Sequence, residues 1–373
     1  MRHNAVMGSN ATTRFWHKLA DKKVQCDLCP RHCVLAEGQS GYCTYRRCDG
    51  GELVLMTYGY SSGFCIDPIE KKPLFHFLPG TPVLSFGTAG CNLGCRFCQN
   101  WNLSRMKIKN ADLAKAPPEK IAQAAQLMAC SGVAFTYNDP VIFHEYAIDT
   151  AKECRALGLK TIAVTAGYVS KEPREEFYAW MDAANVDLKG FTEEFYKKYT
   201  DSALQPVLET LGYIKKKTST WLEITTLLIP GVNDSEYELR TLSEWIAKTL
   251  GPDVPLHLTA FYPSYQMLDH PSMPPGHLLR ARKIVLRSGL HHVYTGNIQD
   301  AQGQTTYCSK CGEKLILRNG FEITGWSLKE KGRCKSCGAL CAGIFEEKPG
   351  KWGPKHLQIQ LKPEKNYRPA ILE

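Results

Sequence analysis

The cysteines constrain this chain more than any other feature. It has 16 of them in 373 residues, and all except Cys65, Cys130 and Cys154 fall into three tight groups. Thiols two or three residues apart can be aimed at one metal by a tight turn, whereas disulfide frameworks are typical of short secreted chains. Residues 1–20 carry no apolar signal segment, and no run of about 18 apolar residues occurs. The sequence therefore predicts a cytoplasmic metalloprotein with no membrane span.

Metal ligation also corrects the apparent charge. Lys and Arg number 46 against 37 Asp and Glu, so the formal net charge is +9. A four-thiolate zinc site carries about −2 and a three-thiolate [4Fe–4S] cluster about −1, so two such sites and one cluster lower the total to roughly +4. The basic excess is then a weak signal for nucleic acid, which is not the expected partner.

The central cysteine group lies in a glycine-rich segment directly after the first predicted strand, with the spacing Cys-x3-Cys-x2-Cys. Three thiolates can hold three irons of a cubane cluster and leave the fourth iron open. Two alternatives are a three-ligand zinc site and unconnected buried cysteines, but zinc usually takes a fourth protein ligand and none is local. The glycines let the backbone approach the cluster, and Phe97 would shield one face. The residues concerned are Cys91, Cys95 and Cys98, with Gly87, Gly90 and Gly94 between and before them.

With Phe97 before its last cysteine, this motif resembles the radical S-adenosylmethionine (SAM) signature. Several segments are similar to AmmeMemoRadiSam-type radical SAM proteins, which are related to activating enzymes of glycyl radical enzymes such as pyruvate formate-lyase, and the resemblance extends over about residues 24–345. It implies that the [4Fe–4S] cluster reductively cleaves SAM to methionine and a 5′-deoxyadenosyl radical, which abstracts hydrogen from a substrate. It also implies a low-potential electron donor such as flavodoxin or ferredoxin. The similar segments are residues 66–73, 98–101, 136–140, 186–191 and 229–234.

The same resemblance suggests which residues contact SAM. Residues 137–140 stand where radical SAM proteins have Gly-Gly-Glu-Pro, so Asp139 would accept from the SAM amino group, cap the following helix, or both. Asp187 and Lys189 share one face of a strand and would hold the ribose and carboxylate, or form an ordinary ion pair. His257 would flank the adenine or the substrate, or be a structural histidine. The predicted cofactor contacts are Phe97, Asn100, Asn138, Asp139, Asp187, Lys189 and His257.

The C-terminal cysteine group has the spacing of a zinc ribbon. Two Cys-x2-Cys pairs are separated by 22 residues, and each second cysteine is followed by a glycine, as knuckle turns require. A unit of about 40 residues with few large apolar side chains needs a bound metal ion to fold. Zinc is the predicted metal, with rubredoxin-like iron as the alternative. The ligands would be Cys308, Cys311, Cys334 and Cys337.

The N-terminal group supplies four more ligands, with the spacing Cys-x2-Cys-x3-Cys-x9-Cys. Both zinc and an auxiliary iron–sulfur cluster that relays electrons accept four thiolates, so ligand softness does not separate them. The sequence therefore predicts a second metal or cluster here without naming it. The ligands would be Cys26, Cys29, Cys33 and Cys43, with Cys48 and His32 as substitutes.

Apolar runs alternating with amphipathic helical segments predict an α/β fold, either a doubly wound sheet or, as we expect, a partial (β/α)6 TIM-type barrel. Four domains follow: an N-terminal Cys-rich metal-binding module (1–75), the radical SAM partial barrel (76–303), the zinc ribbon (304–345) and a loosely ordered polar tail (346–373). The predicted strands are residues 83–86, 133–136, 161–165, 186–188, 222–228 and 256–261.

The sequence is compatible with three functions. The first is a radical SAM oxidoreductase acting on an unidentified substrate, either a small molecule or an RNA base. The second is an activator that removes hydrogen from a glycine of a protein substrate, as glycyl radical enzyme activators do. The third is a non-catalytic iron–sulfur and zinc module that binds RNA or protein. The sequence names neither the substrate nor the oligomeric state.

Overall fold

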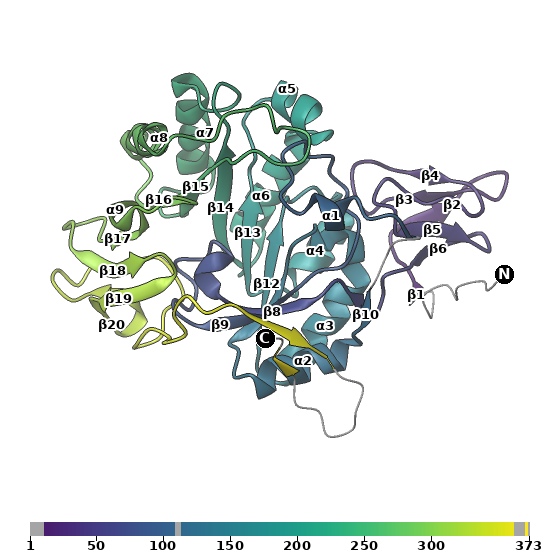
Figure 1. Ribbon diagram of the computed structural model, residues 1–373, viewed down its shortest axis with the longest axis horizontal. Coiled ribbons are helices and arrows are strands. Elements are labelled where there is room, and N and C mark those ends of the chain that lie inside the picture. Colours follow the sequence, from purple (N-terminus) through teal and green to yellow (C-terminus); the bar gives the residue numbers. More distant parts are fainter. Residues whose placement is uncertain (1–10, 109–112, 362–369, 372–373) are drawn as a thin grey trace.

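The computed structural model describes residues 11–108, 113–361 and 370–371. At its centre is a ten-stranded sheet (Figure 1). Seven of its strands are parallel, and their order in the sheet is their order in the chain. Because the order never reverses, the doubly wound alternative is wrong. The parallel strands are β9 (Pro82–Phe86), β11 (Gly132–Phe135), β12 (Lys160–Thr165), β13 (Ala183–Asp187), β14 (Trp221–Leu228), β15 (Leu256–Ala260) and β16 (Val293–Gly296).

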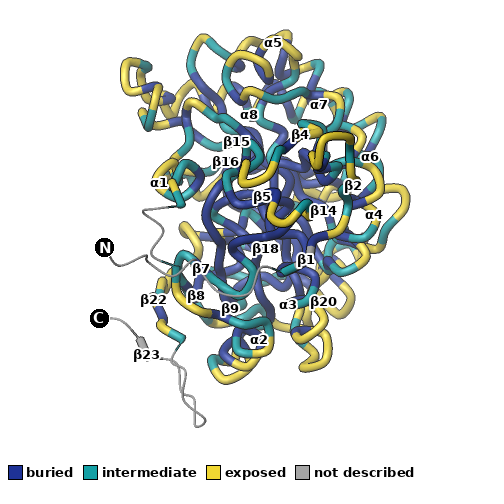
Figure 2. Tube along the Cα trace, turned by 90° about the vertical axis from the view of Figure 1, so that its right-hand side faces the viewer, coloured by how far each residue is buried: buried dark blue, intermediate teal, exposed yellow. Residues whose placement is uncertain are grey.

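All six predicted strands are present, with ends shifted by up to three residues. The sequence missed β16, because its four residues, Val-Tyr-Thr-Gly, are too short and too polar to stand out as an apolar run. The shift is largest for β13, which begins at Ala183 rather than Val186, because alanines give a weak strand signal. The strands are buried in the middle of the molecule, and exposed segments lie on its outside (Figure 2).

Each parallel connection contains one longer helix. Pro118 is the first residue of α2, as its fixed φ allows, and Ser235 caps α7, because its side chain accepts from the Glu238 amide at 3.2 Å. The longer helices are α2 (Pro118–Leu127), α3 (His144–Ala156), α4 (Lys171–Tyr178), α6 (Gln205–Lys217), α7 (Glu236–Thr249) and α8 (Pro275–Arg287). Shorter ones are η1 (Ile69–Lys71), α1 (Trp101–Ser104), η3 (Pro140–Phe143), α5 (Glu193–Phe195), η4 (Tyr196–Thr200), α9 (Ala301–Gln304) and η5 (Glu330–Gly332).

Three antiparallel strands extend the sheet beyond β9. β8 (Phe64–Pro68) pairs with β9, β22 (Leu357–Gln360) pairs with β8, and β23 (Ala370–Ile371) pairs with β22. The expectation of a loosely ordered tail is therefore wrong for β22. Ile359 is buried there, and His356, just before the strand, contacts Asp67 at 2.6 Å. A four-residue strand whose partner lies almost 300 positions away gives little local signal.

Small antiparallel sheets lie at the two ends of the long axis of the molecule (Figure 1). Those at the N-terminal end are formed by β1 (Ala11–Thr12), β5 (Arg46–Asp49) and β6 (Glu52–Leu55), and by β2 (Trp16–Lys18), β3 (Val24–Cys26) and β4 (Val34–Leu35). β7 (Tyr60–Ser61) pairs with β10 (Ala114–Lys115). Those at the C-terminal end are formed by β17 (Thr306–Tyr307), β18 (Lys314–Asn319) and β19 (Glu322–Trp326), and by β20 (Leu328–Lys329) and β21 (Arg333–Cys334).

The C-terminal unit is joined to the sheet through a buried arginine. The guanidinium of Arg318, on β18, donates to the Phe75 carbonyl at 2.6 Å and lies 4.2 Å from the centre of the Phe75 ring. Phe77 and Ile344 form an isolated parallel bridge beside it. These contacts fix the orientation of the C-terminal unit against the segment that precedes β9. Within the described residues, no helix combines the length and apolar character that crossing a bilayer requires.

The packing of β22 can be tested by truncating its buried side chain. Ile359→Ala removes atoms from a closed site and should lower the free energy of unfolding by about 2 kcal/mol or more. The neighbouring Gln358 is exposed, so Gln358→Ala should change stability by less than about 0.5 kcal/mol. Chemical denaturation of both variants measures the difference. Equal stabilities would mean that this strand does not belong to the core.

Candidate active site

The segment that carries the central cysteines begins where β9 ends, and it passes close to neighbouring backbone. A side chain at Gly87 would collide with the Thr136 carbonyl, and one at Gly90 would collide with the Cys43 carbonyl. Gly90 also has φ +86°, which side-chain-bearing residues rarely adopt. Only glycine therefore permits this path.

Asn138, at the end of β11, fastens the same loop. Its Oδ1 accepts from the Thr88 amide at 3.0 Å, and its Nδ2 donates to Thr88 Oγ1 at 3.0 Å and to the Gly90 carbonyl at 2.8 Å. Both N–H donors are thus occupied within the protein. Asn138 is placed to position the cysteine loop, rather than to offer its amide to a cofactor.

A cavity of about 320 Å³ lies against this loop at the carboxyl ends of the parallel strands. That edge is where ligands bind in sheets of this kind. Nine of the ten residues predicted for the cluster and SAM line it: Cys91, Cys95, Cys98, Phe97, Asn100, Asn138, Asp139, Asp187 and Lys189. Only His257 lies outside.

Asp139 is almost fully engaged by its neighbours. Its carboxylate accepts from the Val141 amide at 3.0 Å, the Ala166 amide at 2.8 Å and the Thr165 hydroxyl at 3.0 Å. The Val141 contact is the predicted cap of the helical turn η3. Burial raises the pKa of Asp139, and these three donors act against that rise. The carboxylate therefore keeps at most a small part of its accepting capacity for a ligand.

Asp187 and Lys189 do lie on one face, as their spacing predicted. Lys189 Nζ donates to Asp187 Oδ2 at 2.8 Å, and both line the cavity. Burial alone would lower the pKa of Lys189, but the charge of the neighbouring Asp187 outweighs it, so the pKa of Lys189 lies above its usual value. The cavity thus has a fixed positive charge beside a carboxylate, next to the cysteines.

His257 is held away from the cysteines by a buried carboxylate. Its Nε2 contacts Glu223 Oε2 at 2.7 Å, and its ring packs edge-on against Phe75 at 4.8 Å. Glu223 also accepts from the amides of Phe75 and His76 at 3.0 and 2.8 Å. This network favours the structural role that the sequence left open for His257.

His257 instead lines a second cavity of about 710 Å³ that adjoins the first. The two share Pro73, Gln99, Asn100, Thr136, Tyr137, Thr259 and Asn297 as lining residues. Its walls come from the segment before β9, the ends of β15 and β16, and the turn between β18 and β19. A molecule in the second cavity would therefore contact one in the first.

The donor set of the first cavity fits an iron–sulfur cluster. Burial raises the pKa of Cys91 to about 11 and that of Cys95 to about 12, so these thiols need a cationic partner to ionise at neutral pH. In the described part of the chain, the three Sγ atoms are not all within 4.8 Å of one another. This is wider than one ion requires and agrees with ligands on three different irons.

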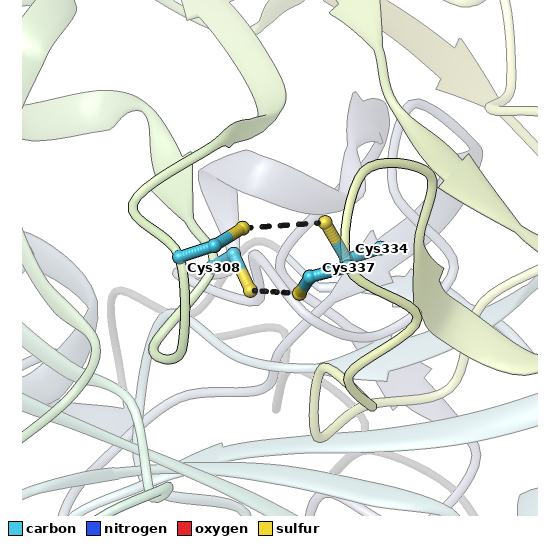
Figure 3. A group of neighbouring side chains, drawn as sticks. Cys308, Cys334 and Cys337 are labelled. Atoms are coloured by element: carbon cyan, nitrogen blue, oxygen red, sulfur yellow. Dashed lines mark hydrogen bonds between the residues drawn. The ribbon is translucent and has the colours of Figure 1, made fainter.

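The C-terminal cysteines form a tighter group. All four Sγ atoms of Cys308, Cys311, Cys334 and Cys337 lie within 4.8 Å of one another, and they point together from two loops (Figure 3). Cys308 and Cys337 are 3.6 Å apart, and Cys311 and Cys334 are 3.8 Å apart. A tetrahedral ion with bonds to sulfur of about 2.3 Å has ligands about 3.8 Å apart. The group is therefore shaped for a single metal ion.

One further group of metal-ligand type was not anticipated: His76, His292 and Cys341, all buried within 4.8 Å of one another. His76 Nδ1 is 2.6 Å from the Ala342 carbonyl, which can only accept, so Nδ1 carries the proton. Nε2 then accepts from the Tyr294 hydroxyl at 2.5 Å. No nitrogen of His76 remains for a metal, and burial lowers its pKa to about 4. The group is structural.

Sequence reasoning missed several residues of the two cavities. Thr165 and Thr225 stand on strands that line the first cavity, and Thr165 fixes Asp139. Glu223 lines neither cavity but contacts His257, and it is the charged residue of a strand otherwise made of apolar residues and threonines. An acidic residue inside a predicted buried strand could have indicated this contact, because a buried carboxylate needs a partner.

The parallel sheet and the cavity define an α/β protein with three cysteines gathered around a cavity at the strand ends. The family model "Radical SAM superfamily" matches residues 86–241. The chain is 40% identical over 325 residues to the uncharacterized protein MJ0808 of Methanocaldococcus jannaschii, in a match that covers 87% of this chain and 96% of that one. The chain belongs to the radical SAM superfamily.

More distant relatives include activating enzymes. A 4-hydroxyphenylacetate decarboxylase activating enzyme of Clostridium scatologenes is 30% identical over 120 residues, or 31% of this chain and 38% of that enzyme. A solved domain of a pyruvate-formate lyase-activating enzyme from Bacteroides vulgatus is 21% identical, with a TM-score of 0.39, over 45% of this chain and 99% of that chain. The resemblance inferred from the motif is confirmed at the level of a radical SAM protein with activating-enzyme homologues.

The role of Asn138 predicts a measurable loss. Asn138→Ala leaves the Thr88 amide and the Gly90 carbonyl unpaired, which costs about 1–3 kcal/mol for each buried group. We expect lower thermal stability and less iron per chain after anaerobic reconstitution. Asn102→Ala, an exposed change in α1 close to the same loop, should alter neither. Normal iron content in Asn138→Ala would show that the loop does not depend on this amide.

Proposed function

We propose that this chain is a radical SAM enzyme in which Cys91, Cys95 and Cys98 bind a [4Fe–4S] cluster and the adjoining cavity binds SAM. The observation that supports this proposal is that three partly exposed cysteines and the Asp187–Lys189 pair line one cavity at the strand ends. When bound, the cluster supplies the electron that splits the sulfonium C–S bond of SAM, giving methionine and a 5′-deoxyadenosyl radical that takes hydrogen from the substrate.

The chain's own residues bind and orient the cofactor. The ammonium of Lys189 is a donor for the SAM carboxylate, and Asp187 is an acceptor for ribose hydroxyls or the amino group. Phe97 and Leu93 are buried and line the same cavity, so they restrict water around the reacting atoms. Asn138 and Asp139 act indirectly, through the loop and the strand end that they fasten.

The second cavity would hold the substrate, because it adjoins the first and is the larger of the two. A protein segment is the favoured substrate class, since curated relatives bear the names of activating enzymes. In that case a backbone glycine of the partner gives up hydrogen, and a flavodoxin- or ferredoxin-type donor supplies electrons. A small molecule is the alternative, and a cavity of about 710 Å³ has the volume of such sites.

The architecture we propose is a partial barrel, flanked by the N-terminal module and the C-terminal unit. The simple strand order and the location of both cavities at the strand ends support it. For the C-terminal unit we propose zinc rather than iron, as the usual metal of paired Cys-x2-Cys knuckles. Thiols kept reduced for three metal sites suit a cytoplasmic setting.

The proposal is tested by anaerobic reconstitution with SAM and dithionite, followed by an assay for 5′-deoxyadenosine. The wild-type chain should form it, and Cys95→Ala should fall to the background rate because the cluster loses one of three ligands. Cys130→Ala, which changes an isolated buried cysteine, should retain activity. If Cys95→Ala cleaves SAM as well as wild type, the central cysteines are not the catalytic centre.

The Asp187–Lys189 pair makes a separate prediction for binding. Lys189→Met removes a charge-assisted hydrogen bond of about 1.5–3 kcal/mol, so the Kd for SAM should rise roughly tenfold or more. Lys189→Arg should recover part of the affinity, and Lys216→Met, on the exposed end of α6, should leave it unchanged. Anaerobic calorimetry on reconstituted protein measures all three. Unchanged affinity in Lys189→Met would reduce the pair to an ordinary strand-end salt bridge.

A further inference from the structure

The N-terminal cysteines form a third sulfur site. Cys26, Cys29 and Cys43 are buried and Cys33 is partly exposed, in a shell that includes Val24, Leu28 and Leu35. The Cys26 amide donates to the Cys33 carbonyl at 3.0 Å, and Gly41, two residues before Cys43, lies against Cys33 Sγ. The four cysteines therefore lie close together in one apolar shell.

Their spacing differs from that of the C-terminal cysteines. In the described residues, no three of these four Sγ atoms lie mutually within 4.8 Å, whereas all four do in the C-terminal group. Ligands of one zinc ion are about 3.8 Å apart, but ligands on separate irons of a cubane are farther apart. The central cysteines, which belong to the radical SAM motif, show the same wider spacing.

A buried cation lies beside this group. Arg46 is 1% exposed, forms an ion pair with Glu145 and donates through Nε to the Ile142 carbonyl at 2.9 Å. Its Nη1 has no hydrogen-bond partner among the described residues. Arg46 follows Cys43 by three residues, and its carbonyl accepts from the Gly41 amide at 2.8 Å. A buried donor without a partner, next to four thiols, indicates an anionic occupant that accepts hydrogen bonds.

The other residues that the spacing offered as ligands are engaged elsewhere. The Cys48 thiol contacts Glu37 Oε2 at 3.9 Å, and His32 Nδ1 contacts Asp27 at 3.3 Å. Cys26, Cys29, Cys33 and Cys43 therefore make up the ligand set.

We propose that Cys26, Cys29, Cys33 and Cys43 bind a second [4Fe–4S] cluster. Four thiolates complete the coordination of all four irons, so this cluster has no open iron for SAM. An electron carrier is the function that such a saturated cluster can perform.

The site is in direct contact with the loop of the central cysteines. The Cys43 carbonyl lies against Gly90, and Arg31 Nε donates to the Asn92 carbonyl at 2.5 Å. Gly90 and Asn92 are the two chain neighbours of Cys91. The Leu28 carbonyl also accepts from the Ser170 amide at 3.1 Å, beyond the end of β12. The two sites are thus adjacent within one packed structure.

This adjacency gives the electron path, a part of the proposal that rests on the proposed function. A reduced flavodoxin or ferredoxin gives up one electron and is oxidised, and the N-terminal cluster passes from the 2+ to the 1+ state. It returns to 2+ when the electron moves to the central cluster, which uses it to cleave SAM. No proton or bond is exchanged in either transfer.

The cluster itself is tested without any activity. A variant with Cys91, Cys95 and Cys98 all replaced by Ala should retain about four irons and four sulfides per chain after anaerobic reconstitution, with one zinc and an EPR signal on reduction. Adding Cys33→Ala to that variant should remove the iron and the signal. Circular dichroism should show that both remain folded, and Cys130→Ala should keep about eight irons.

A triple variant that holds a second zinc in place of iron would overturn the proposal, as would one that holds no further metal. Neither result touches SAM cleavage by the wild-type chain, so failure here and failure of the proposed function are distinguishable.

The electron path needs a second measurement. In Cys33→Ala with an intact central site, the ratio of flavodoxin-driven to dithionite-driven 5′-deoxyadenosine formation should fall at least about tenfold relative to wild type, because dithionite can reduce the central cluster directly. An unchanged ratio would overturn the relay.

Discussion

The close approach of the cysteine loop to surrounding backbone is the constraint on which the active site depends. Gly87 packs against the end of β11 and Gly90 against the N-terminal module, and Asn138 fastens the loop between them with three hydrogen bonds. The loop is therefore enclosed from two sides before any metal binds. The N-terminal module and the sheet also share one apolar core, since the packing around Leu28 and Leu35 continues into the strands. The three central thiols therefore have a fixed location at the strand ends.

The distances between sulfur atoms distinguish the cysteine groups better than the number of residues between the cysteines does. Cys-x2-Cys pairs occur in both outer groups, so the sequence left the N-terminal metal open. In the structure all four C-terminal Sγ atoms lie within 4.8 Å of one another, whereas among the described residues no three of the N-terminal Sγ atoms do. The distances between the sulfur atoms depend on how turns from different parts of the chain pack together, which the local sequence does not determine.

The sequence predicted a feature correctly where a local pattern of residues was enough to determine it. Continuous apolar runs located β12 and β14, and the Asp187–Lys189 pair followed from the alternation of side chains along β13. It failed where the deciding partner is remote. β22 depends on β8, and His257 depends on Glu223, from a neighbouring strand. Asp139 illustrates the intermediate case, because its capping role was visible locally but its bonds from Thr165 and Ala166 were not.

The C-terminal unit does more than close one end of the fold. Arg318 is fully enclosed beside Glu70, and it donates to the Phe75 carbonyl, while Glu70 and Phe75 both line the second cavity. A buried charge pair of this kind contributes little net stability, but removing one partner leaves the other charge uncompensated. The wall of the second cavity therefore depends on β18, a strand that lies between the two Cys-x2-Cys pairs in the chain. The metal proposed for those four cysteines would thus help to hold one wall of the cavity beside the central cysteine loop.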